Sequence, residues 1–547
     1  MHLVFLNQYY PPDAAPTGVM LEAVVEELAR QGHAVTVLCA AGGYAGGGEE
    51  VISEQLSVIS DGRGGEEVIS EQSSVISDGR GGDDRDLGRS QSSPIASHPL
   101  HGVPRIIRVG ATSFGRGTFV GKLLDYAFYY LGVAWKLATL RPGPGRIIAL
   151  TTPPYLSVLA RLFSKFRRVD HGHWVMDLYP DVMAAHGMLR ETSGIYQVLK
   201  RLARWGFGGR RCAAILTLGP DMAGRVERVM SDQSSVIREE GEGGGVAGLS
   251  ALTSTLNSQR VLWVPLWGGE KVRDPEMPIS NYQPSTLNVQ LPSPLRRQRG
   301  WAADEVIVMY SGNMGLGHRF EEILAAAKRV NIEHRTPNIE YRSEEVTNPM
   351  ASSREMIESR NESCSPETQA DCSNPQLSTL NSQLPPDSQL FPSYRFVFFG
   401  GGKRRGEVAA FQDAHPGAAV ELHDYAPAGM LMAHLQSADV HFVSLEDSWT
   451  GTMVPSKLQG IFAAGRPVIF VGGAESSIGR WVAESGGGWV VGQGDVAGLR
   501  AALAEAGSRP IREARGRAAL TFAQQHFDKR TNVARVAEIL TSERPLR

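Results

Sequence analysis

Short apolar runs alternate with helical patterns in two successive stretches of this chain. In the first half, the run Leu3–Leu6 is followed by a Pro- and Gly-rich loop, a helical pattern over Val19–Gln31 and a second run at Ala34–Cys39. In the second half, Val306–Tyr310 leads through a Gly-rich turn into a helical pattern over Arg319–Val330. Such alternation is typical of parallel sheets covered by helices. The chain is therefore predicted to be an α/β protein with two parallel-sheet domains.

Repeated phrases interrupt this alternation at irregular intervals. Val51–Glu67 recurs almost unchanged as Val68–Asp84, and STLNSQ stands at both Ser254–Gln259 and Ser378–Gln383. Structural repeats have regular spacing and carry a core. These phrases are rich in Ser, Gln, Gly and Glu, too polar to offset the entropy lost on ordering. We expect disordered low-complexity insertions in surface loops, over residues 42–101, 231–259 and 335–392.

Roughly 400 residues remain without the insertions, a usual length for two domains. The pattern predicts a Rossmann-like domain over residues 1–270 and a second over 300–525, joined by a Pro- and Gln-rich linker at 271–299. A helix is expected over 526–547. Ligands of open parallel sheets bind outside the carboxyl ends of the strands. Two such domains facing each other place the site in the cleft between them.

Composition excludes several functional classes. The chain has 547 residues and a formal net charge of −3, which argues against a dedicated nucleic-acid binder. Its four Cys residues show no CxxC spacing, so neither a zinc site nor a disulfide framework is indicated. The sequence has no HExxH motif, and we expect no protein-held metal. The start reads as a strand rather than a signal peptide, and a cytoplasmic location is expected.

One apolar segment, Leu123–Leu140, approaches the length of a membrane span. A span needs about 20 predominantly apolar residues, whereas this segment carries Asp125 and Lys136. Two interpretations stay open. The segment is either a buried or half-buried helix, or a helix that lies on a membrane surface with its aromatic side chains at the interface.

The Gly-rich turn Ser311–His318 follows a strand and precedes a helix. Gly312, Gly315 and Gly317 allow the backbone to approach a ligand closely. A helix N-terminus that follows such a turn suits an anion such as a diphosphate. The turn is neither GxGxxG nor a Walker loop. A tight turn with no ligand is the alternative.

A second candidate lies in Val454–Val471. Pro455 and Ser456 suit the first turn of a helix, and Lys457 then stands at the positive end of the helix dipole. A cation there is locally unfavourable, and a bound phosphate would relieve that cost. Lys457 is therefore read as a ligand residue, with a solvated surface lysine as the alternative.

The first half offers candidates at two loops. Gly18, after the first strand, would let a helix approach a phosphate, or it belongs to an ordinary cap and turn. Asp177 and Asp181 flank the DLYPD loop at the end of a strand expected over His173–Asp177. Carboxylates there suit a sugar hydroxyl or a general base, with helix capping as the alternative for Asp181. His171, before that strand, and His173, at its start, are weaker candidates.

Taken in order, these segments resemble the retaining, nucleotide-sugar-dependent glycosyltransferases of the GT-B fold, family 4. The resemblance is greatest to a bacterial branch similar to the L-fucosamine transferases of O-antigen and capsule synthesis. It covers nearly the whole chain outside the insertions. The stretches that carry it are NQYYPPDAAPTG, WVMDLYPD, MYSGNMGLGHRFEEIL, FVFFGGG, HDYAP, SADVHFVSL and VPSKLQGIFAAGRPVI.

The resemblance implies a nucleotide-sugar donor on the second domain, a glycan or lipid-linked glycan acceptor on the first, and no cofactor or metal. It also implies contact with the inner face of the plasma membrane and no nucleic acid. Transfer would retain the anomeric configuration, with Asp177, Asp181 and Lys457 as the catalytic candidates. By matching positions, the substrate-binding residues would be Gly18, Gly312, Asn313, Gly315, Gly400, Gly401, Tyr425, Ser456 and Leu458.

The chain departs from the family pattern at three positions. Thr452 and Gly460 stand where the family commonly has a pair of Glu, and Asn313 replaces the usual Arg. These changes leave the sugar and the base of the donor open. Two alternatives remain: another GT-B enzyme such as an epimerase, or a non-catalytic nucleotide-sugar-binding protein impaired by its insertions.

Overall fold

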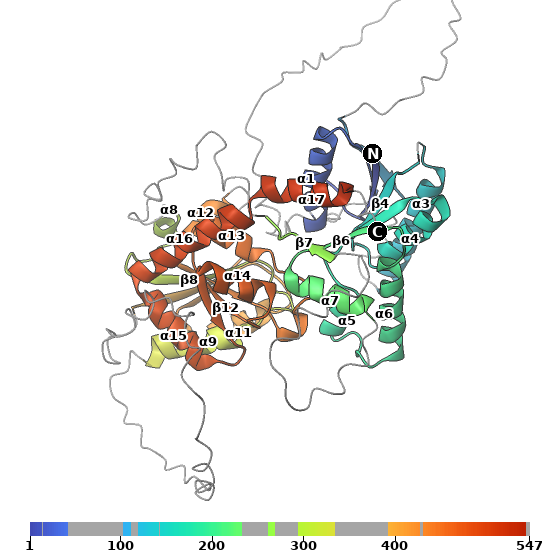
Figure 1. Cartoon of the computed structure of the whole chain (residues 1–547). Helices are drawn as coiled ribbons and strands as arrows, with labels where there is room; N and C mark the ends of the chain where they lie inside the picture. The colour runs from blue at the N-terminus through green and yellow to red at the C-terminus, as the bar shows by residue number, and fades with distance from the viewer. Residues whose placement is uncertain are drawn as a thin grey trace, which may run out of the picture.

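The computed structural model describes residues 1–13, 15–41, 102–110, 119–141, 143–231, 261–267, 294–333, 392–426 and 430–542. The expected insertions, apart from their edge residues Ser231 and Pro392, and most of the expected linker lie outside these residues. The described part forms two α/β domains side by side, each built on one parallel sheet (Figure 1). This arrangement confirms the predicted fold class.

The N-terminal sheet has seven strands in the order β3-β2-β1-β4-β5-β6-β7, and every pair is parallel. The inner strand β1 is flanked by later strands on both sides, as in a doubly wound sheet. The strands are β1 (His2–Leu6), β2 (Ala34–Ala40), β3 (Arg105–Val109), β4 (Arg146–Ala149), β5 (Asp170–Trp174), β6 (Cys212–Thr217) and β7 (Val261–Trp263).

Helices cover both faces of this sheet because alternate residues of each strand point to opposite faces. Leu3 and Phe5 of β1 belong to the apolar cluster that includes α1, whereas Val4 and Leu6 belong to the cluster of α3 and α4. The helices are α1 (Pro16–Arg30), α3 (Phe119–Thr139), α4 (Leu156–Arg167), α5 (Asp181–Ala185), α6 (Gly194–Phe207) and α7 (Pro220–Met230).

The C-terminal sheet has six parallel strands in the order β10-β9-β8-β11-β12-β13. They are β8 (Val306–Ser311), β9 (Tyr394–Phe399), β10 (Val420–His423), β11 (Val440–Ser444), β12 (Val468–Val471) and β13 (Gly488–Val491). The helices of this half are α8 (Pro294–Gln298), α9 (Glu321–Lys328), α11 (Arg405–Ala414), α12 (Leu431–Gln436), α13 (Lys457–Ala463), α14 (Ser477–Ser485), α15 (Val496–Gly507), α16 (Arg509–His526) and α17 (Lys529–Thr541).

The helix expected over 526–547 corresponds to α17, Lys529–Thr541. The chain breaks between α16 and α17, where the Asp528 side chain accepts a hydrogen bond from the Thr531 backbone N–H at 2.8 Å and caps α17. Helix α16 packs on α13, whereas α17 packs on α1 and β6 of the N-terminal domain. Arg146 of β4 donates to the carbonyl oxygens of Leu540 and Ser542. The chain therefore returns to the first domain at its end.

The two domains share apolar and polar contacts. The rings of Trp263 and Trp481 lie 6.5 Å apart, and the residues of one continuous apolar cluster come from both domains. Across the same boundary, the backbone N–H of Ser477 donates to Asp221 Oδ2 at 3.0 Å, and that of Leu178 donates to the Thr452 carbonyl at 2.9 Å. Residues at the ends of the two sheets are thereby fixed relative to each other.

Candidate functional site

A small cluster around Lys457 lies at the carboxyl end of the C-terminal sheet. Lys457, the first residue of α13, places its Nζ atom 3.2 Å from His318 Nε2 and 3.5 Å from the carbonyl oxygen of Asn313. The same ammonium lies 5.2 Å from the centre of the Tyr310 ring, within cation–π range. The Gly-rich turn after β8 and the start of α13 therefore meet.

The tautomer of His318 follows from its partners. Its Nδ1 atom lies 2.7 Å from the Ser444 carbonyl oxygen, which only accepts, so Nδ1 carries the hydrogen. Nε2 is then the acceptor for the ammonium of Lys457. Burial, followed by the charge of Lys457, holds the pKa of His318 well below its usual range. A neutral imidazole thus orients the lysine.

Two glycine loops stack at this edge. Gly312, Gly400 and Gly402 have φ values of 129°, 121° and 124°, a region that favours glycine. A Cβ atom at Gly400 would lie 2.3 Å from the Gly312 carbonyl oxygen, and one at Gly402 would lie 2.4 Å from Asn313 Oδ1. The backbone N–H of Met314 donates to the Gly401 carbonyl at 2.7 Å. The loops after β8 and β9 therefore depend on glycine for their close approach.

Replacing Gly400 with alanine is expected to lower the free energy of unfolding by about 3 kcal/mol, because positive-φ strain adds to a backbone clash. Gly406, in α11, is the matched control, since a Cβ atom there meets nothing within 4 Å. Gly406→Ala is expected to change stability by less than about 1 kcal/mol, in the stabilising direction. Chemical denaturation of both variants measures the difference. Equal stability of the two variants would contradict the stacked arrangement.

Tyr425 borders these glycines on the side of β10. Its ring would lie 3.2 Å from a Cβ atom at Gly400 and 3.3 Å from one at Gly401. Arg405 donates to the carbonyl oxygens of Gly400 and His423, at 2.6 and 2.8 Å, and fixes the end of β10 against the loop. An aromatic face beside a glycine turn suits the stacking of a planar base.

The residues next to Lys457 are arranged differently from expectation. Helix α13 begins at Lys457, with Ser456 as its N-cap and no side-chain cap bond, so Pro455 and Ser456 are not in its first turn. The Leu458 side chain is fully buried in the apolar core, which leaves only its backbone for a ligand. Because α13 has seven residues, the positive charge of Lys457 matters more here than the helix dipole.

Gly18 lies within the first turns of α1, where a Cβ atom would stand 3.1 Å from the Tyr9 carbonyl oxygen and 3.3 Å from Tyr10 Cα. Packing of α1 against the preceding loop therefore accounts for glycine at this position. Gly315 is different, because a Cβ atom there would meet only Asn313 Nδ2, at 3.7 Å. Contact of either glycine with a diphosphate stays a prediction.

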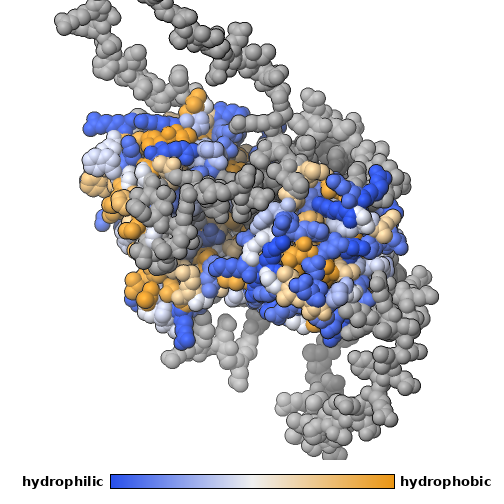
Figure 2. All heavy atoms as spheres, turned by 180° about the vertical axis from the view of Figure 1, so that it is seen from behind, coloured by the Kyte–Doolittle hydropathy of each residue, from blue (hydrophilic) through white to orange (hydrophobic). Residues whose placement is uncertain are grey.

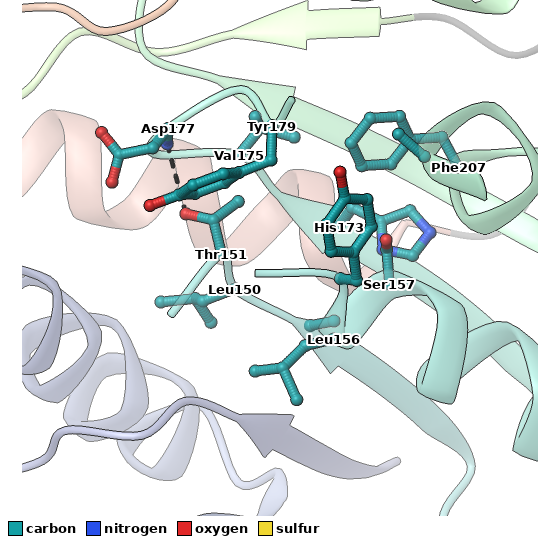
Figure 3. A pocket seen from close by; sticks show the side chains of 12 residues that line it. Leu150, Thr151, Leu156, Ser157, His173, Val175, Asp177, Tyr179 and Phe207 are labelled. Atoms are coloured by element: carbon teal, nitrogen blue, oxygen red, sulfur yellow. Dashed lines mark hydrogen bonds between the residues drawn. The ribbon is translucent and has the colours of Figure 1, made fainter. Parts of the chain in front are cut away.

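A pocket in the N-terminal domain begins at Asp177, just after β5 (Figure 3). Asp177 and Tyr179 lie on one side of it, and His173 and Phe207 lie on the other. The backbone N–H of Asp177 donates to the Thr151 hydroxyl at 3.2 Å. The remaining lining residues come from β4, α4, α6 and the segments next to them and after β5: Ala149, Leu150, Tyr155, Leu156, Ser157, Val175 and Ala203.

Loss of hydration raises the pKa of Asp177 from 3.8 to about 6. Although the side chain is partly exposed at the surface, desolvation is the one cause of the shift. A carboxylate with a pKa near neutrality, at the end of a strand and in a pocket, is suited to general-base chemistry.

Asp181 occupies a different environment from Asp177. It opens α5 and accepts from Arg225 Nε at 2.7 Å, and Arg225 also donates to the Thr450 carbonyl of the other domain at 3.0 Å. The N-cap of α5 is Pro180 rather than Asp181, so the capping alternative does not hold. The ion pair makes Asp181 part of the contact between domains, while a catalytic role for it stays untested.

The histidines near this pocket lie inside the strand, because β5 spans Asp170–Trp174 and not His173–Asp177 as expected.

Among the residues that the structure describes, one group of potential metal ligands comes together, namely His171, His173 and Cys212, with ligand atoms within 4.8 Å of one another. Spacing along the chain did not indicate this cluster, since adjacent strands assemble it. The Arg161 guanidinium acts on both His173 and Cys212, a charge that disfavours a cation.

Trp449, in the loop after β11, lies against residues of both domains. The Trp449 ring lies 4.6 Å from the His186 ring, centre to centre, and 3.0 Å from the position of a Cβ atom at Gly317. The Leu178 bond to Thr452 joins the loop after β5 to the loop that carries Trp449. The pocket after β5 and the glycine turn after β8 therefore border one interdomain boundary. Sequence reasoning missed His318 and Trp449, although His318 closes the motif that it had singled out.

Comparison with solved structures identifies the fold of this chain. No protein-family model matches the sequence, and no curated protein matches it either. Solved structures do match, among them WaaG, a glycosyltransferase involved in lipopolysaccharide biosynthesis, at 14% identity and a TM-score of 0.51, covering 99% of this chain and 100% of that one. The chain has the GT-B fold.

Two further GT-B matches come from trehalose phosphate proteins. An α,α-trehalose-phosphate synthase (UDP-forming) from Burkholderia vietnamiensis is 14% identical, with a TM-score of 0.52 and coverage of 99% of this chain and 97% of that one. The E. coli trehalose-6-phosphate structure bound with UDP-2-fluoro glucose is 12% identical, with a TM-score of 0.51 and coverage of 99% and 100%. Identities this low establish the fold alone.

Proposed function

We propose that this GT-B protein is a retaining glycosyltransferase that moves a sugar from a nucleotide-diphosphate sugar to an acceptor hydroxyl. One observation carries the proposal. An oriented ammonium group, that of Lys457, meets a glycine turn at the carboxyl ends of the C-terminal strands. A cation beside exposed backbone N–H groups is the chemistry that recognises a diphosphate. The solved GT-B structure bound with UDP-2-fluoro glucose supports the donor class.

The donor would lie across the C-terminal domain. Lys457 and the turn at Asn313 and Gly315 would hold the diphosphate, while Tyr425 and the Gly400–Gly401 turn would border the base. His318 would not touch the donor. It would act as a positioning residue, because its neutral Nε2 accepts from Lys457 and directs the ammonium.

Transfer breaks the bond between the anomeric carbon and the diphosphate oxygen, and negative charge develops on that oxygen. Lys457 would stabilise this charge from a fixed position, with no reorganisation during the step and without a protein-held metal. The acceptor hydroxyl would attack on the face that the diphosphate leaves, so the configuration is retained. The leaving phosphate oxygen would take the hydroxyl proton, and no enzyme nucleophile is required.

The acceptor would enter the pocket at Asp177. A carboxylate with a pKa of about 6 accepts a hydrogen bond from a sugar hydroxyl at neutral pH and raises its nucleophilicity. The aromatic lining, including Tyr179 and Phe207, suits the apolar faces of a sugar. We propose that the acceptor is a glycan or lipid-linked glycan destined for the cell surface, and that the transfer takes place in the cytoplasm. WaaG, with its role in lipopolysaccharide biosynthesis, supports this class.

A thermal-shift screen against a panel of nucleotide sugars tests the donor class, because a ligand of the native state raises the melting temperature. The stabilising donor is then incubated with candidate acceptors, and NMR of the product reports the anomeric configuration. A product of inverted configuration would contradict the mechanism. Stabilisation without transfer to any acceptor would favour a non-catalytic binding protein. If none of the donors raises the melting temperature, the proposal is wrong.

A further inference from the structure

We propose that helices α3, α4 and α6 form a docking surface for an anionic lipid bilayer. The three helices lie side by side on one side of the N-terminal domain (Figure 1). We call their outward face the α3–α4–α6 surface. The inference goes beyond the transferase reaction and does not depend on it.

Helix α3 is apolar on two opposite faces. Its inner face, with Tyr129, Val133 and Leu137, is buried against the sheet. Its outer face exposes four large apolar side chains at i, i+4, i+7 and i+11, so they form one stripe along the helix. Exposed fractions in the stripe reach 68% and 69%. Its members are Leu124, Phe128, Leu131 and Trp135.

Helices α4 and α6 continue this apolar surface. On α4, Leu162 and Phe166 are one turn apart and exposed, Phe166 to 79%. On α6, the exposed apolar residues again follow helical spacing: Ile195, Val198, Leu202 and Trp205. Arg161 of α4 lies over the Trp205 ring at 4.5 Å and ties the two helices together. Figure 2 shows orange apolar side chains at the outer edge of this domain, next to blue hydrophilic ones.

Charge identifies the occupant of the surface. Helices α4 and α6 contain three Lys or Arg residues each and no Asp or Glu. The whole stretch Phe119–Arg211 has 14 Lys and Arg residues against five Asp and Glu residues, a net charge of +9 in a chain whose net charge is −3. Apolar stripes interleaved with basic side chains match the interface of an anionic bilayer, where apolar side chains enter the acyl boundary and cations meet lipid phosphates.

The geometry favours a surface-bound protein. Among the described helices, none is long and apolar enough to cross a membrane, and the inner face of α3 is already committed to the domain core. Helices α4 and α6 also form part of the pocket wall, since Leu156 and Ser157 come from α4 and Ala203 and Phe207 from α6. Docking would therefore hold the Asp177 pocket near the bilayer.

Vesicle sedimentation of the full chain tests the proposal, with phosphatidylcholine vesicles that contain or lack phosphatidylglycerol. The wild type is expected to sediment with the anionic vesicles and much less with the neutral ones. The variant Lys165→Gln/Arg168→Gln/Arg201→Gln is expected to bind anionic vesicles about 100-fold more weakly, at roughly fivefold for each charge removed. The variant Leu131→Ser/Trp135→Ser is expected to lose about tenfold or more.

A charge-matched control removes three exposed arginines elsewhere, in Arg500→Gln/Arg517→Gln/Arg530→Gln, and is expected to bind as the wild type does. Melting temperatures confirm that each variant is folded. Absence of wild-type binding to anionic vesicles, binding that is independent of phosphatidylglycerol, or unchanged binding by either surface variant would overturn the proposal. Nucleotide-sugar binding, measured on the same samples, reports separately on the transferase.

Discussion

Replacing Lys457 with alanine is expected to weaken binding of the nucleotide diphosphate by about tenfold to 100-fold, the range for loss of a hydrogen bond to a charged group. The expected loss is large because the ammonium is oriented by His318 and the Asn313 carbonyl rather than moving freely in solvent. The transfer rate is expected to fall further, since leaving-group charge grows during the step. Isothermal titration with the nucleotide diphosphate, followed by turnover measurements, gives both quantities.

Two companion variants separate this effect from a general loss of charge. Lys328, at the far end of α9, is exposed, and Lys328→Ala is expected to leave donor affinity unchanged. Lys457→Arg keeps the charge but not the compact ammonium, so intermediate affinity is expected. Wild-type affinity in Lys457→Ala would remove this residue from the donor site and, with it, the principal support for the proposed reaction.

Replacing Asp177 with asparagine is expected to reduce transfer by about tenfold to 100-fold, because the charged acceptor of the hydrogen bond from the attacking hydroxyl is lost, while donor affinity stays the same. In the wild type, activity is expected to fall as the pH drops through about 6, where the carboxylate becomes protonated. The asparagine variant should show no such inflection. A pH–rate profile of both proteins decides the matter, and an identical inflection in the variant would contradict this assignment.

Stability offers a readout of Asp177 that does not depend on turnover. Because burial raises its pKa from 3.8 to about 6, the native state favours the protonated form, and ionisation costs stability as the pH rises through that range. Asp177→Asn is thus expected to melt higher than the wild type above pH 6, with a difference that vanishes near pH 4. Asp181→Asn, which breaks the ion pair with Arg225, is expected to melt lower.

Much of the architecture was accessible from the sequence. Alternating apolar and helical patterns identified both parallel sheets, since each strand such as Leu3–Leu6 is apolar on both faces and each covering helix is amphipathic. Helix and strand ends were less accurate. β5 begins three residues before the expected start. His171 and Gly172 are not typical strand residues, but both are buried and both pair with β6.

The site was only partly accessible for a different reason. The glycine turn and Lys457 were recognisable locally, but the pairing of Lys457 with His318 joins residues 139 positions apart. It arises because β8 and β11 are neighbours in the sheet, an order that no local pattern encodes. The α3–α4–α6 surface could not be predicted for the same reason. Three helices that are separate in the sequence assemble it, and only the stripe on α3 lies within an apolar segment that the sequence pattern had singled out.

The polypeptide passes between the domains twice, once between β7 and α8 and again between α16 and α17. The crossing between α16 and α17 is short, with two residues between the helices, so rotation of one domain against the other would have its pivot there. The short break at Phe527 and Asp528 is the point where backbone torsions absorb this rotation. Substrate entry is thus expected to proceed by hinged opening, with α17 travelling as part of the first domain.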